Sequence, residues 1–66
     1  MEFKIGDAVR IGNGQVACVI VDRMLNVAFT RRLGNGQDEP ATGNLYAVRN
    51  RYGETGWHEE AHLSLL

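Results

Sequence analysis

Glycine-containing turns divide this chain into short runs of β-branched and alternating apolar residues, which constrains the fold more than any other feature. Residues 8–11 alternate apolar and polar side chains with the period-two pattern of a half-buried strand. Gly12-Asn13-Gly14 then indicates a turn, because Asn and Gly tolerate the positive φ angles of tight hairpins. The run from Val16 to Val21 is apolar at every position, which predicts a central strand covered on both faces.

The middle of the chain allows two structures. Residues 22–33 can form a helix that is capped by Asp22 and stopped by Gly34. They can also form a strand after a short turn at Asp22-Arg23. The β-branched Val27 and Thr30 and the β-rich surroundings favour extended structure.

Residues 34–44 hold three glycines, the only proline, two acidic residues and no large apolar side chain. This composition predicts a long exposed loop. Mobility and function often concentrate in such loops.

Extended structure returns in the last third of the chain. Residues 45–52 predict a strand with Tyr46, Val48 and Tyr52 on one face. A turn at Gly53, a short extended piece, one helical turn and a last strand at residues 63–65 follow. We therefore expect one all-β domain, residues 1–66, that forms a small barrel or sandwich of about five short strands. A long loop, or a short helix, is inserted in its middle.

The chain of 66 residues is short for an independent domain. Such a domain buries only about 60% of the surface that its unfolded form exposes, so its stability is modest. Small domains often add a disulfide, a metal or self-association. A single cysteine, Cys18, excludes an internal disulfide, and its apolar neighbours favour a packing role. One cysteine and two histidines cannot form a cysteine-rich zinc site, so we expect a homo-oligomer.

The formal net charge of −1 gives the protein no overall attraction to nucleic acid or to an anionic membrane. No apolar run approaches the roughly 20 residues that span a bilayer. The N-terminus lacks the basic start and the long apolar stretch of a signal peptide. We expect a soluble, cytoplasmic protein without a membrane partner.

Three motifs occur in a characteristic order: Phe3-x-x-Gly6-Asp7-x-Val9-Arg10, Tyr46-Ala47-Val48 and Glu60-Ala61-x-Leu63. This order resembles the SH3-like barrels. Among them it is most similar to the plasmid-encoded, trimethoprim-resistant dihydrofolate reductases, which are short chains with the same opening. The resemblance covers both ends of the chain and implies a small SH3-like barrel. It also implies a gene on a mobile element, such as a plasmid, a phage or an integron cassette.

The active-site segment of those reductases is not present. That family forms a tetramer around a central pore, where a Val-Gln-Ile-Tyr segment holds the cofactor and folate. The matching stretch here is Thr55-Gly56-Trp57-His58, which lacks the amide and the phenol. A shared fold does not imply a shared reaction. We therefore expect no enzyme activity and no cofactor. The alternative is an oligomeric reductase-like enzyme that binds NADPH, a pterin or a nucleotide.

The densest group of reactive side chains surrounds His58. This histidine could act as a general base near neutral pH, tuned by Glu59 or Glu60. Neighbouring strand residues point to opposite faces, however, and no nucleophile completes a triad. His58 and His62 alone are also too few for a metal-ligand set. The sequence predicts neither a catalytic residue nor a metal site.

Trp57 has two interpretations. A small barrel needs large apolar side chains, so a buried Trp57 is favoured. An exposed Trp57 would be a candidate hot spot for a partner or for self-association. Tyr46, Tyr52 and Trp57 could then form an aromatic surface for an extended peptide, although both tyrosines are more often core residues.

Two arginines on one predicted strand, Arg49 and Arg51, could follow phosphates while Tyr52 stacks on a base. A nucleic-acid-binding barrel is thus a second alternative, although nearby acidic residues favour a solvated face. The leading prediction is a non-enzymatic binding or assembly module for a protein or small-molecule partner. Its candidate binding residues are Trp57, His58, Tyr52, Arg49 and Arg51.

Overall fold

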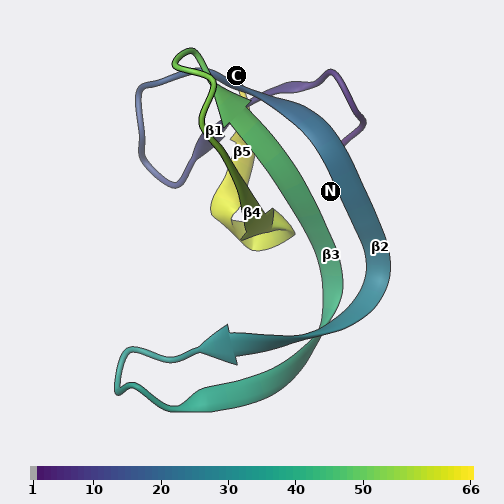
Figure 1. Ribbon diagram of the computed structural model, residues 1–66, viewed down its shortest axis with the longest axis vertical. Coiled ribbons are helices and arrows are strands. Elements are labelled where there is room, and N and C mark those ends of the chain that lie inside the picture. The colour runs from purple at the N-terminus through teal and green to yellow at the C-terminus, as the bar shows by residue number, and fades with distance from the viewer. Residues whose placement is uncertain (1) are drawn as a thin grey trace.

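Five antiparallel strands and one turn of 3-10 helix form the structure, a computed structural model that describes residues 2–66 (Figure 1). The all-β prediction is confirmed, including the helical turn before the last strand. The elements are β1 (Ala8–Ile11), β2 (Cys18–Arg32), β3 (Asp38–Asn50), β4 (Thr55–Glu59), η1 (Glu60–His62) and β5 (Leu63–Leu65).

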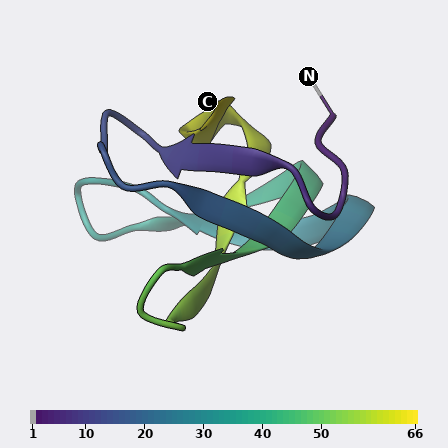
Figure 2. The ribbon, with the colours of Figure 1, turned by 90° about the horizontal axis from the view of Figure 1, so that it is seen from above.

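The strands follow the order β4-β3-β2-β1-β5 in one sheet. β2 lies in the centre, as its apolar sequence predicts. β4 and β5 are the two edges, and within residues 2–66 no hydrogen-bonded ladder joins them. The prediction of a barrel is therefore wrong in one respect, because the sheet twists and curls but does not close (Figure 2). β5 has only three residues, and η1 occupies the chain between the two edges.

A long β2–β3 hairpin replaces the predicted middle loop. Residues 22–32 are strand, as favoured, but no turn interrupts them at Asp22-Arg23. The loop prediction for residues 34–44 is wrong, since β3 begins at Asp38 and pairs with the end of β2. Pairing with β2 makes this segment a strand, although its composition is typical of a loop. Pro40 is tolerated because β4 pairs only with residues 45–49, so β3 is an edge strand at this point.

Two irregularities bend this hairpin. The register shifts once between Ile20 and Asp22 and again between Met24 and Val27. At the second shift Asn26 has a φ of 55°, and its backbone N–H donates to the Asn44 side-chain oxygen at 3.0 Å. Such bulges increase the twist and bend a strand. The part of the hairpin beyond them, residues 27–43, is called the arm here, and it curves beneath η1 (Figure 1).

The core lies between the N-terminal segment, β1 and β5 on one side and the first half of the hairpin on the other. Val9, Ile20 and Tyr46 are almost completely buried. Cys18 is buried in the same cluster, which confirms its packing role. Tyr52 is 67% exposed, so its core prediction is wrong. β3 ends at Asn50, which leaves Tyr52 in the following turn.

No helix within residues 2–66 has the length and apolar character needed to cross a membrane.

Candidate functional site

The five candidate binding residues all lie on the β3–β4 hairpin, but they do not form one site. Trp57 pairs with Ala47 and His58 pairs with Tyr46, so these two neighbours point to opposite faces. Arg49 shares the face of Trp57. Arg51 and Tyr52 lie in the turn between the strands.

In the turn between the strands, Arg51 lies against the Tyr52 ring. The guanidinium carbon of Arg51 lies 4.9 Å from the centre of the Tyr52 ring, and Nη2 donates to the tyrosine hydroxyl at 2.7 Å. The arginine therefore covers one of the two ring faces on which a nucleobase could stack.

Trp57 is 47% exposed, so the prediction of a buried tryptophan is wrong. The other face of the sheet supplies the large core side chains. There Tyr46 packs edge-on against Phe3, with 5.3 Å between the ring centres. Because side chains alternate along β4, Trp57 points away from this aromatic pair.

On the face of the sheet opposite the core, apolar side chains surround Trp57. Ala47 is its cross-strand partner, and Leu45 and Met24 form the neighbouring pair. Ala47 is only 7% exposed although it lies outside the core cluster. Its low exposure is therefore due to its neighbours on this face. Met24 is 42% exposed. Met24, Leu45, Ala47 and Trp57 are called the outer patch here.

His58 lies on the core-facing side of β4, half-buried, and its ring folds back over Gly56. Glu59 points to the opposite face, so the two adjacent side chains do not meet. His62 lies in η1 and is exposed. Among the residues that the structure describes, no three His, Cys, Asp or Glu side chains group as metal ligands.

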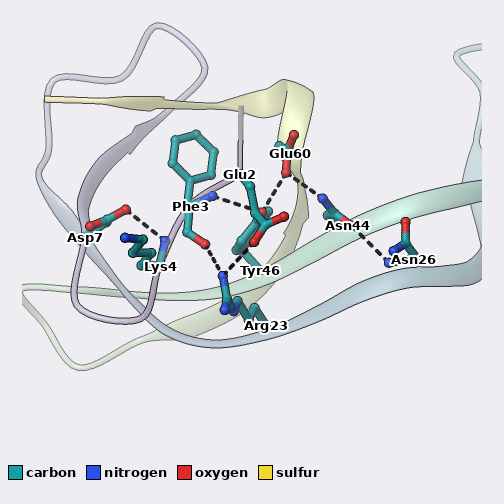
Figure 3. A network of polar contacts seen from close by, with 9 residues as sticks. All are labelled: Glu2, Phe3, Lys4, Asp7, Arg23, Asn26, Asn44, Tyr46 and Glu60. Carbon is teal, nitrogen blue, oxygen red and sulfur yellow. Dashed lines mark hydrogen bonds and ion pairs between the residues drawn. The ribbon is translucent and has the colours of Figure 1, made fainter.

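A partly buried polar network that the sequence did not reveal holds the N-terminal segment and η1 on the sheet (Figure 3). The Tyr46 hydroxyl donates to Glu60 at 2.6 Å and accepts from the Phe3 N–H at 3.1 Å. The Asn44 amide donates to the same Glu60 oxygen at 2.9 Å. These bonds, Tyr46 first and Asn44 second, lower the pKa of Glu60. Burial and the Glu60 bond raise the pKa of Tyr46.

The arm contacts the rest of the sheet through Arg31. Its Nε and Nη2 donate to the two Glu59 oxygens at 2.9 and 2.7 Å, and Nη1 donates to Glu39 at 3.0 Å. Leu45 pairs with Glu59, and Arg31 pairs with Glu39 on the continuation of the same β3 face. The bend of the arm turns this face back toward η1. Arg31 lowers the pKa of Glu59, and the two glutamates raise that of Arg31.

A cleft of about 740 Å³ lies between the arm, η1 and β5. Phe3, Phe29, Leu63 and Leu65 contribute its apolar wall. Arg31, Glu59, Glu60, Asn26 and Asn44 contribute its polar wall. The fold alone brings the arm and β5 together, so the sequence carried no signal for this cleft.

The chain matches no protein family model, no curated protein and no solved structure. The resemblance to the trimethoprim-resistant reductases thus rests on the quoted motifs alone, and the reductase-like enzyme stays the alternative hypothesis.

Proposed function

We propose that this protein is a non-enzymatic binding and assembly module whose copies associate through the outer patch. The exposure of Trp57, the only tryptophan, carries this proposal. Tryptophan offers a large apolar surface at a small entropic cost, and it is enriched among the residues that dominate binding energy. The exposed Met24 extends the same surface, and its flexible thioether adapts to a facing side chain.

A second copy is the occupant that best fits the patch. The core cluster has seven buried side chains, which is little for an isolated domain. Exposed side chains of opposite charge also lie on this face, with Arg49 one row beyond Trp57 and Asp22 beside Ala47. Around a two-fold axis, the arginine of each copy can face the aspartate of the other. The patch is therefore self-complementary in both apolar surface and charge.

A concentration series with two readouts tests this proposal. Light scattering gives the molar mass, and the emission maximum of Trp57 reports its burial. We expect the mass to double with rising concentration while the emission shifts to the blue. Trp57→Ser should remain a monomer. Tyr52→Ser is the matched control, since it removes an exposed aromatic ring outside the patch and should leave association intact. A wild-type monomer at high micromolar concentration, with unchanged emission, would contradict the proposal.

A further inference from the structure

The two sulfur-containing side chains within residues 2–66 differ in their exposure to solvent. Cys18 is 7% exposed and belongs to the core cluster, whereas Met24 is 42% exposed. An oxidant must reach a sulfur atom to react with it, so susceptibility to oxidation follows exposure. Within the described part of the chain, Met24 is therefore the sulfur that a dissolved oxidant can reach.

Met24 also lies where its chemistry affects assembly and not the core. It forms a cross-strand pair with Leu45, beside the pair of Ala47 and Trp57 in the outer patch. It does not belong to the core cluster, so a change of its side chain leaves the packed interior intact. A modification of this sulfur therefore alters the proposed interface while the monomer stays folded.

We propose that Met24 is a redox-sensitive modification site, at which a hydroperoxide oxidises the thioether to a sulfoxide and thereby separates the copies. A sulfur lone pair attacks one oxygen of the hydroperoxide, and the O–O bond breaks as the S–O bond forms. The proton of the transferred oxygen passes to the leaving oxygen, which departs as water or an alcohol. The sulfur loses two electrons and the hydroperoxide gains them. This inference rests on the proposed assembly through the outer patch.

The sulfoxide weakens the interface because it is polar. Oxidation turns a flexible apolar side chain into one with a strong hydrogen-bond acceptor. The neighbouring Leu45 and Ala47 have no side-chain donor to satisfy this acceptor, and the facing patch of a second copy is apolar as well. Burial of a polar group without a partner is unfavourable, so we expect the sulfoxide to weaken association by at least about tenfold.

Treatment of the purified protein with hydrogen peroxide tests the inference. Peptide mass mapping locates the added oxygen atom, and light scattering over a concentration series gives the dissociation constant before and after treatment. We expect oxidation at Met24, intact Cys18, at least about tenfold weaker association and an unchanged backbone-amide NMR spectrum in β1 and β5. Methionine sulfoxide reductases, which return both sulfoxide epimers to the thioether, should restore association.

Two variants assign the effect to this one sulfur. Met24→Leu keeps an apolar side chain of similar volume without a sulfur, so it should associate like the wild type and be insensitive to peroxide. Met1 and Cys18 remain in this variant and control for oxidation elsewhere. Met24→Gln places a polar side chain of similar length in the patch, and it should weaken association without any oxidant.

The rate of Met24 oxidation gives a second readout. Because association buries the patch, the rate should fall as the protein concentration rises. Free methionine in the same solution corrects for the consumption of peroxide. In the monomeric Trp57→Ser variant the rate should not depend on concentration.

The outcomes separate this inference from the proposed assembly. Untreated wild type that stays monomeric overturns both. Wild type that associates equally well before and after oxidation of Met24 overturns the inference alone. So does an equal loss of association in peroxide-treated Met24→Leu, which would place the effect at another residue.

Discussion

The Tyr46 side chain joins core packing to a polar network, and its hydroxyl can be removed without changing the volume of the core. Tyr46→Phe leaves the buried Phe3 N–H without its acceptor and removes one of the donors to Glu60. An unmade bond of this kind costs about 1–3 kcal/mol, so we expect the free energy of unfolding in urea to fall by that amount.

Tyr52→Phe is the control for this substitution. Its hydroxyl is exposed and accepts only from Arg51, so the free energy of unfolding should stay unchanged within error. Equal effects of the two substitutions would show that the Tyr46 network contributes nothing to stability.

Glu60 should make the fold sensitive to acid. Hydrogen bonds from Tyr46 and then Asn44 lower its pKa in the folded state from the ordinary value of 4.5. A lowered folded pKa gives stability that is fully present above the unfolded value and is lost as the pH falls through the folded value. Urea unfolding between about pH 7 and about pH 3 measures this loss.

Two variants assign the acid dependence to this network. Glu60→Gln should reduce the slope of stability against pH in the acid range. Tyr46→Phe removes the larger cause of the pKa shift and should reduce the same slope. Wild-type slopes in both variants would contradict the assignment.

At single positions the sequence predicted well which side chains share a face, but not which face is covered. The alternating pattern put Tyr46 and Val48 on one face of a strand, and the structure buries both. The pattern could not place Trp57, because alternation is equally consistent with this side chain on either face of β4. The covered side depends on where Phe3 and β5 cross the sheet.

Among the elements, the arm was the least predictable. Residues 34–44 have the composition of a loop, and their strand structure comes from pairing with the end of β2. Register is a non-local property, and the bulge that sets it depends on one asparagine, Asn26, with a positive φ. The Arg31–Glu59 contact joins residues 28 positions apart, so no local pattern indicates it.

The position of the arm should depend on Arg31. Arg31→Met removes its bonds to Glu59 and Glu39, and we expect hydrogen exchange to accelerate severalfold over residues 38–43. Arg32→Met is the matched control, because Arg32 pairs only with Asp38 inside the arm. Exchange measured by mass spectrometry compares the two variants. The same acceleration in both would mean that Arg31 does not hold the arm.

For the whole molecule, the number of strands and the all-β class followed from the sequence, whereas barrel closure did not. Closure requires the two edge strands to meet in register, and within residues 2–66 no ladder joins β4 and β5, between which η1 is inserted. The open sheet leaves the β5 edge and the outer patch on separate surfaces.

Charge exchange across the outer patch tests the symmetry of the proposed assembly. Asp22→Arg and Arg49→Glu each place like charges opposite one another in a two-fold dimer, so each should weaken dimerisation by about tenfold. The double variant restores opposite charges and should recover most of the affinity measured by light scattering. Neither side chain belongs to the core cluster, so all three variants should fold. A double variant that dimerises more weakly than both single variants would exclude this arrangement, because independent losses add whereas paired charges compensate.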